Sequence, residues 1–138
     1  MRFTWDESYD VGVEKFNEQH RHFFEISNSI YDLVEKGEVD REELMAPISE
    51  LINYGLYHMS AEEGAFHKYS YPKTEEHIEA HNFYRQKTQE YLEKSMDLNI
   101  NIVTLAKEIA DFASDWLFEH IRLVDKQYSS FLEGKEID

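Results

Sequence analysis

The chain has 138 residues, of which 41% are hydrophobic, and this suits one domain with a buried core. It has no cysteine, so disulfides, zinc–thiolate sites, iron–sulfur clusters and thiol catalysis are excluded. The formal net charge of -15 would repel phosphate backbones and anionic lipids, so we expect no nucleic-acid partner and no membrane partner. The first residues lack the apolar stretch of a signal peptide, and no apolar run is long enough to cross a bilayer. We therefore expect a cytoplasmic protein with a single domain, residues 1–138.

Helical periodicity dominates the chain, whereas the alternation typical of strands and the dipeptides of hairpin turns are missing. The first helix is predicted at 17–36, where Gly37 is a typical stop. The second is predicted at 41–69 behind an N-cap at Asp40. Pro47 lies inside it, so this helix should either kink there or begin just before the proline.

The second half of the chain contains two more helical patterns. Tyr71-Pro72 interrupts the second pattern, because the residue before a proline avoids helical backbone angles. Thr74 is then a candidate N-cap for a third helix at 74–95, and a fourth helix is predicted at 102–120.

Four amphipathic helices with short connections predict an all-α fold, an antiparallel up-down-up-down four-helix bundle. An irregular N-terminal arm precedes the bundle, with aromatic anchors at Phe3, Trp5 and Tyr9. A short C-terminal segment through Tyr128 and Phe131 follows it.

Histidines and carboxylates recur at helical spacing along the chain. Residues four apart lie on the same face of a helix, and this spacing separates His58 from Glu62 and His77 from His81. One such pair is weak evidence in a chain with seven histidines, but the complete set falls on or just beyond all four predicted helices. The candidate metal ligands are His20, His58, Glu62, His77, His81, His120 and Asp125. Placed near one level of a bundle, they would form a dinuclear site in its core.

The ligand types narrow the choice of metal. Imidazole with carboxylate suits iron, manganese, zinc or copper. Seven ligands are too many for one tetrahedral zinc ion, and the His-Glu-x-x-His motif of zinc proteases is missing. The Glu-x-x-His motifs of ferritin-like di-iron proteins are missing as well. A histidine-rich, carboxylate-bridged iron pair remains, with manganese or a metal-free bundle as alternatives.

Several motifs together carry a resemblance to a known family. They are Trp5 in the arm, Asn17-Glu18-Gln19-His20, His58-Met59-Ser60-Ala61-Glu62-Glu63, Tyr71-Pro72 followed by His77 and His81, and Trp116-Leu117-Phe118-Glu119-His120-Ile121 closing on Asp125. On these residues the chain resembles the hemerythrin family, specifically its single-domain bacterial members, over nearly its whole length.

The resemblance implies two iron ions, in diferrous and diferric states, with a bridging oxo or hydroxo group. The implied ligands are His77, His81 and His120 on one iron, His20 and His58 on the other, and Glu62 and Asp125 bridging both. An open position on the second iron implies that dioxygen is the partner and that it binds reversibly, for storage, delivery or sensing. A protein that binds oxygen rather than an enzyme is therefore favoured, and a monomer is expected.

The chain departs from the family pattern beside the implied bridge Glu62. Met59 stands where phenylalanine is usual, and the small residues Gly64 and Ala65 could widen access to the metals. Two alternatives therefore stay open: a di-iron enzyme that reduces peroxide or acts as an oxidase, and an oxygen-sensing module that acts through a separate partner.

Apolar residues near the implied ligands would exclude water from the pocket. The candidates are Phe24, Phe83, Trp116, Ile121 and Leu123. The histidines outside the implied ligand set, His22 and His67, are predicted to be bystanders, and His67 is expected to be exposed.

Overall fold

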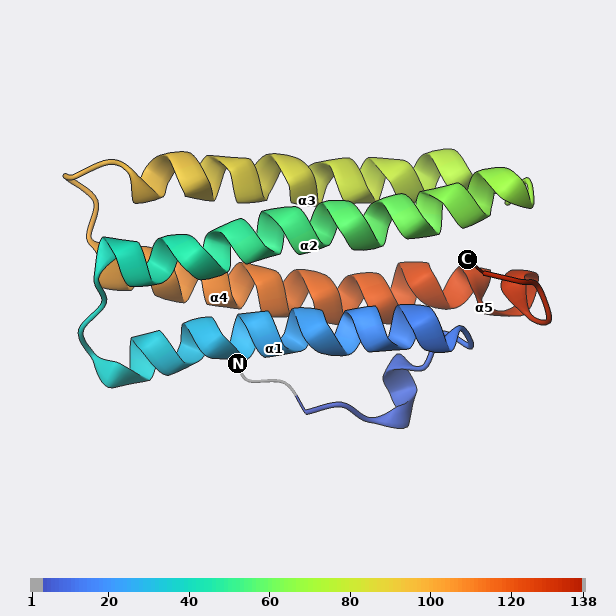
Figure 1. Ribbon diagram of the computed structural model, residues 1–138, viewed down its shortest axis with the longest axis horizontal. Coiled ribbons are helices and arrows are strands. Elements are labelled where there is room, and N and C mark those ends of the chain that lie inside the picture. The colour runs from blue at the N-terminus through green and yellow to red at the C-terminus, as the bar shows by residue number, and fades with distance from the viewer. Residues whose placement is uncertain (1–3, 138) are drawn as a thin grey trace.

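The computed structural model describes residues 4–137, so Phe3 of the predicted arm lies outside the described residues. The long helices lie side by side and alternate in direction (Figure 1). They are α1 (Glu14–Lys36), α2 (Arg41–Lys68), α3 (Thr74–Ser95) and α4 (Ile102–Glu119). Each contacts the next along the chain, and α4 closes the ring against α1. The predicted all-α, antiparallel four-helix bundle is confirmed.

The helix ends follow the local chemistry of the chain. Helix α1 begins at Glu14, three residues before the predicted start, and ends where Gly37 adopts a left-handed φ of 82°. Asp40 occupies the N-cap position of α2, and Pro47 lies within that helix. The predicted N-cap at Thr74 is wrong by one residue: Thr74 is the first residue of α3, and its hydroxyl donates a hydrogen bond to the carbonyl of Tyr71 (2.6 Å).

Short helical segments precede and follow the bundle in sequence, and both lie at the same end of it (Figure 1). A 3-10 turn, η1 (Glu7–Tyr9), lies in the N-terminal arm. After α4 the chain continues through a π-helical turn, η2 (His120–Asp125), into α5 (Lys126–Leu132). The C-terminal segment is thus helical, and it buries Tyr128 and Leu132.

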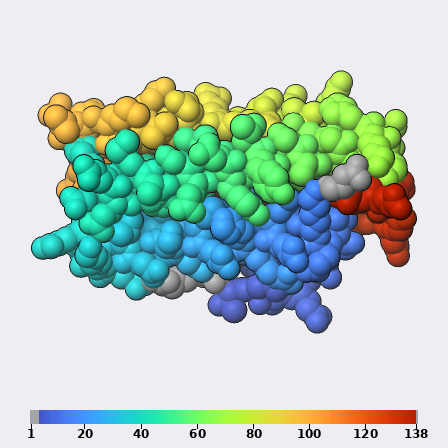
Figure 2. Space-filling model, in the orientation of Figure 1, coloured from blue at the N-terminus to red at the C-terminus, as the bar shows by residue number. Residues whose placement is uncertain are grey.

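The core is a stripe of buried side chains along each helix. In the space-filling view α1 and α2 lie against each other along one face of the molecule (Figure 2). Gly55 on α2 leaves room for the ring of Tyr84 on α3, because a Cβ there would lie 2.7 Å from a ring carbon of Tyr84. The hydroxyl of Tyr84 donates to the carbonyl of Leu51 (2.8 Å), which satisfies it in this apolar setting.

Some apolar residues that the sequence pattern placed inside lie on the surface. Phe83 and Leu123 are 53% and 66% exposed. Phe83 directly precedes the buried Tyr84, and Leu123 lies two positions from the buried Ile121 and Asp125. Neighbouring positions in a helix point about 100° apart. The prediction that Phe83 and Leu123 line a pocket is therefore wrong. Within the part of the chain that is described, no helix combines the length and apolar character needed to span a bilayer.

Candidate metal centre

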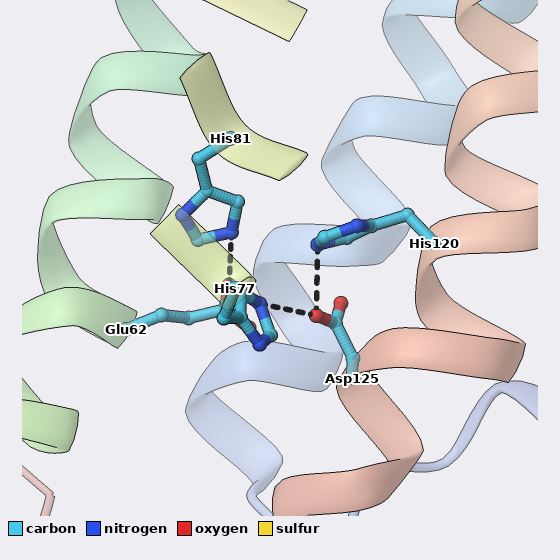
Figure 3. A group of neighbouring side chains, drawn as sticks. All are labelled: Glu62, His77, His81, His120 and Asp125. Carbon is cyan, nitrogen blue, oxygen red and sulfur yellow. Dashed lines mark ion pairs between the residues drawn. The ribbon is translucent and has the colours of Figure 1, made fainter. Parts of the chain in front are cut away.

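The structure brings all seven predicted ligand side chains together in the bundle core, where each is at most 5% exposed. Their ligand atoms form two overlapping groups, and within each group all of these atoms lie within 4.8 Å of one another. The groups are Glu62, His77, His81, His120 and Asp125, and His20, His58, Glu62 and Asp125. Figure 3 shows the side chains of the first group pointing toward one another. Both groups share the same two carboxylates.

The π-helical turn explains how His120 and Asp125 serve one site. They are five residues apart, and in an α-helix this spacing would place them about 140° apart around the axis. The wider turn of η2 puts both side chains on the same face, with His120 Nε2 2.9 Å from Asp125 Oδ1 (Figure 3). A local departure from α-helical geometry therefore completes the ligand set.

Glu62 lies between histidines of both groups. Its Oε1 atom is 3.3 Å from His58 Nε2, 3.5 Å from His77 Nε2 and 3.1 Å from His81 Nε2. His58 comes one turn before Glu62 on α2, and the other two histidines come from α3. One carboxylate therefore faces ligands of each group, as a bridging carboxylate must.

Asp125 has the same arrangement on the opposite side of the centre. Its Oδ1 atom is 2.9 Å from Nε2 of both His77 and His120, and its Oδ2 atom is 3.1 Å from His20 Nε2. The two oxygens of Asp125 thus point to different groups: Oδ1 faces His77 and His120 of the first group, and Oδ2 faces His20 of the second.

The electrostatics of the centre favour positive charge. Burial alone would raise the pKa of Glu62, but the charge and hydrogen bonds of its histidine neighbours hold that pKa well below the ordinary value. Burial and the charge of Glu62 would raise the pKa of Asp125, yet its histidine partners, His120 first, also hold it well below the ordinary value. Both carboxylates are therefore ionised although they are fully buried in the core.

The histidines around the two carboxylates differ in how readily they take up a proton. Burial would lower the pKa of His77, but the two carboxylates outweigh it and raise that pKa to about 10. The pKa of His120 is lowered instead, because burial and the neighbouring His81 and His77 outweigh the same Asp125 oxygen. Five imidazoles packed this closely cannot all carry a proton, whereas a metal ion would supply charge to several of them at once.

Buried polar atoms without a hydrogen-bond partner indicate whether a cation would fit at this centre. Within the described residues, the buried side-chain nitrogens and oxygens that lack a hydrogen-bond partner all belong to this cluster. They are His20 Nδ1, Glu62 Oε1, the Nε2 atoms of His77, His81 and His120, and both Oδ atoms of Asp125. Burying such groups unpaired is costly. Except for His20 Nδ1, they all face the centre, so coordination of cations would satisfy them.

Comparisons with known proteins agree with this geometry. The model of the hemerythrin HHE cation binding domain matches residues 11–132. The chain belongs to the hemerythrin family. It is 32% identical over 129 residues to a bacteriohemerythrin of Clostridium acetobutylicum, covering 91% of this chain and 98% of that relative. A hemerythrin-like protein of Naegleria gruberi is 27% identical over 130 residues, covering 94% and 93%. A crystal structure of wild-type hemerythrin has the same fold, with a TM-score of 0.85 at 24% identity over 97% of this chain and 100% of that chain.

Behind the candidate ligands lies a layer of hydrogen-bond partners to which sequence reasoning assigned no role. His58 Nδ1 donates to the side-chain oxygen of Gln19. His81 Nδ1 donates to Glu63 Oε2 (2.7 Å), and Arg85 pairs with the same oxygen at 3.0 Å. Because each Nδ1 carries the proton, each Nε2 keeps its lone pair free for a metal. Gln19 and Glu63 directly adjoin His20 and Glu62 in sequence, and that adjacency was the available signal.

A further partner comes from the C-terminal segment. The hydroxyl of Tyr128, a fully buried side chain on α5, donates to Glu62 Oε2 at 2.7 Å. Burial, together with the negative charges of Glu62 and Asp125, raises the pKa of Tyr128 well above the ordinary value, so the phenol keeps its proton. The hydroxyl thus fixes one oxygen of the central carboxylate. Sequence reasoning placed Tyr128 in a tail and gave it no role.

Aromatic rings enclose the hemerythrin centre. Phe16 and Phe23 pack edge-on against His58, with centroid distances of 5.8 and 5.5 Å, and Phe66 packs against His77 at 4.7 Å. Of the predicted lining residues, Trp116 stacks on His120 at 4.3 Å. The others behave differently: Ile121 is fully buried, whereas Phe24 packs against Trp5 and Tyr9 of the N-terminal arm.

The departures beside Glu62 lie partly at the surface. Met59 is buried, while Gly64 is exposed, and a Cβ added there would meet no atom within 4 Å. Gly64 and Ala65 line a surface pocket of about 270 Å³ together with Ile137, and no ligand residue is among its lining residues. This surface pocket therefore does not reach the candidate metal ligands directly.

The histidines outside the ligand set occupy other surroundings. His22 packs against the ring of Tyr54, with a centroid distance of 4.2 Å, and lies 3.5 Å from Glu25. His67 is exposed near the end of α2. Neither residue belongs to the two ligand groups.

Proposed function

We propose that this hemerythrin binds two iron ions at the centre and uses them to bind dioxygen reversibly, for storage, delivery or sensing. The observation that carries the proposal is the pair of overlapping ligand groups that share Glu62 and Asp125. Two iron ions held there would supply the two electrons that reversible dioxygen binding requires. Imidazole and carboxylate ligands suit iron, and the family model is that of a cation binding domain.

The two halves of the centre differ in a way that supports binding of a small ligand. His77, His81 and His120, with the shared carboxylates, offer one metal five protein ligands. His20 and His58, with the same carboxylates, offer the other metal only four. The half with fewer protein ligands is where an external ligand would enter.

The surroundings favour binding over turnover. Phe16, Phe23, Phe66 and Ile121 are fully buried around the ligand histidines, so they keep water and larger substrates away. Gln19, Glu63 and Tyr128 hold His58, His81 and Glu62 in fixed orientations. A rigid, dry lining of this kind limits side reactions.

The decisive experiment is a visible spectrum with metal analysis on the same sample. The metal-free protein is loaded with ferrous iron under nitrogen, freed of excess metal, exposed to oxygen and then returned to nitrogen. We expect two iron ions per chain, matching the two ligand groups, and an absorption band that appears with oxygen and disappears without it. A fully loaded protein that stays colourless in oxygen would refute the proposal.

A second measurement separates binding from catalysis. Hydrogen peroxide and a reductant are added to the loaded protein, and their consumption is compared with the rate at which the oxygenated form decays by itself. We expect no sustained consumption beyond that decay, because the ligands lie beneath a buried aromatic layer. Sustained turnover would instead support the peroxide-reducing alternative.

A further inference from the structure

Trp116 has a special position among the rings that touch the ligand histidines. Its ring lies 4.3 Å from that of His120 with an angle of 12° between the planes, so the two are stacked. The rings of Phe16, Phe23, Phe66 and Tyr128, which touch other ligand histidines, are buried. Trp116 is only partly buried. Among the described residues, Trp116 is therefore the aromatic side chain that both contacts a candidate ligand histidine and is partly exposed to solvent.

We propose that Trp116 is the port through which electrons pass from an external donor to the oxidised centre. The inference rests on the proposed function, because a diferric centre cannot supply electrons to dioxygen until it is reduced again. Two molecules of a one-electron donor are oxidised, and each of the two ferric ions gains one electron. A bridging oxo group would take up one proton from water to become hydroxo. The indole serves as the path and is not itself consumed.

The stacking geometry supports this role. Electron transfer through protein slows steeply with distance, and contact between two parallel π systems shortens the step between donor and metal. One face of the indole lies on His120, a ligand of the three-histidine group, while part of the ring is open to solvent. The surface and the ligand are thus separated by a single ring.

The same ring also connects to the other half of the centre. Trp116 contacts Tyr84 at a centroid distance of 4.7 Å, and Tyr84 contacts Phe23 at 5.9 Å. Phe23 in turn packs against His58 at 5.5 Å. Both ligand groups therefore lie on one continuous series of ring contacts that reaches the surface at Trp116.

Charge near the port indicates the class of donor. Asp115 and Glu119 flank Trp116 on α4, and both are exposed. The chain as a whole carries a formal net charge of -15. Such a surface concentrates small cations and repels anions, so the favoured donor is a small cationic one-electron carrier.

The first test measures reduction of the diferric protein by photoreduced methyl viologen, a cationic one-electron donor, from the loss of ferric absorbance. We expect Trp116→Leu to slow the reduction and Trp116→Phe, which keeps a stacked ring, to stay near the wild-type rate. Phe83→Leu, which removes an exposed ring on α3, is the matched control and should leave the rate unchanged. The partly buried Tyr54, whose ring lies 5.3 Å from that of Phe23, offers the competing route from the surface. A wild-type rate in Trp116→Leu, or a fall only in Tyr54→Leu, would overturn the proposal.

The second test needs no turnover, because the chain has only two tryptophans, Trp5 and Trp116. Trp5→Phe leaves Trp116 as the sole indole, and its fluorescence lifetime is measured with ferric iron or redox-inactive zinc in the centre. We expect a markedly shorter lifetime with ferric iron, and a smaller change for Trp5 in the Trp116→Phe variant. Equal lifetimes of Trp116 with both metals would contradict an electronic contact with the centre.

The two proposals can fail separately. The oxygen-dependent band is measured on the wild-type protein, whereas the electron port is tested by comparing the reduction rates of the variants. If the wild-type protein lacks that band, the proposed function is refuted. If the band is present and Trp116→Leu is reduced as fast as the wild type, only the electron port is refuted.

Discussion

At the scale of single residues, the candidate ligands differ in the hydrogen-bond partner behind each imidazole. His81 is backed by the carboxylate of Glu63, which is itself paired with Arg85, whereas His58 is backed by the neutral amide of Gln19. An anionic partner makes an imidazole a stronger donor than a neutral one does. The three-histidine half is thereby suited to the more highly charged metal state.

This asymmetry gives the first prediction. Glu63→Gln keeps the size and an oxygen acceptor but removes the charge behind His81, so metal affinity should fall by about 10- to 100-fold. Competition with a chromophoric chelator measures the change. Glu79→Gln, an exposed position on α3, removes the same charge from the surface and is expected to have little effect. Equal losses in both variants would mean that overall charge, rather than the bond to His81, sets the affinity.

A second prediction concerns the contact of two helices through a glycine. Gly55→Ala places a methyl group 2.7 Å from the buried ring of Tyr84, so overpacking should lower the free energy of unfolding by about 1–3 kcal/mol. Urea unfolding of the metal-free protein measures it. Gly64→Ala is the matched control on the same helix, because its methyl group meets nothing within 4 Å. In Gly64→Ala the higher helix propensity of alanine should raise the free energy of unfolding by about 0.5–1 kcal/mol.

At the scale of helices, α1 and α4 are joined by a buried polar contact. The hydroxyl of Tyr31 donates to Asp111 Oδ1 at 2.5 Å and lies 3.1 Å from Ser114 Oγ. Burial, and next the hydrogen bond to the Asp111 carboxylate, raise the pKa of Tyr31 from 10.0 to about 12. The folded state therefore holds this phenol proton more tightly than the unfolded chain does.

The third prediction follows from the sign of that shift. The stabilising contribution of Tyr31 is complete below pH 10.0 and is lost as the pH rises toward about 12. The free energy of unfolding should thus fall across this alkaline range, and it should fall less steeply in Tyr31→Phe. Urea titrations at several alkaline pH values measure both slopes, with Tyr57→Phe at an exposed tyrosine as the control. Identical slopes in the wild type and Tyr31→Phe would contradict the assignment.

Helical spacing carried most of what could be predicted about the elements. The pairs His58–Glu62 and His77–His81 are four apart, so any α-helix aligns them. The alignment of His120 with Asp125 could not be derived in this way, because it depends on a π-helical turn that no local pattern announced. Tyr128 was likewise out of reach, since its contact with Glu62 depends on how α5 packs against α2.

The exposed apolar residues show a second limit of prediction from the sequence. Phe83 and Leu123 are as hydrophobic as the residues of the core, but whether they point inward depends on the rotation of their helices. Sequence pattern defined a stripe on each helix and could not decide which residue at its edge is covered. The ligands were easier to identify because their chemistry, and not only their position, distinguishes them.

At the scale of the whole molecule, the centre ties the bundle together. Its candidate ligands come from α1, α2, α3 and the chain beyond α4, so a bound metal would link every long helix of the described structure. Without a cation, two buried carboxylates and five crowded imidazoles remain in the core. Metal binding and stability are therefore coupled. The expectations of a monomer and of a cytoplasmic location stay predictions.

The fourth prediction tests this coupling. A ligand present at 100 times its dissociation constant stabilises the folded state by about 2.7 kcal/mol, so removing the metal with a chelator should lower the melting temperature. Circular dichroism of loaded and stripped samples measures the difference. His77→Ala should abolish most of it, whereas His67→Ala, at an exposed histidine outside the centre, should retain it. A metal-dependent shift that survives in His77→Ala would place the stabilising ion elsewhere.

The π-helical turn also determines in which direction the side chains of the following helix, α5, point. Helix α5 continues directly from η2, so the turn determines the direction in which Tyr128 leaves the helix axis. The same few residues thus align His120 with Asp125 and aim a hydroxyl at Glu62. A one-residue insertion or deletion between His120 and Tyr128 would rotate the phenol by about 100°. The number of residues in this stretch is therefore as strictly constrained as the identity of the ligands.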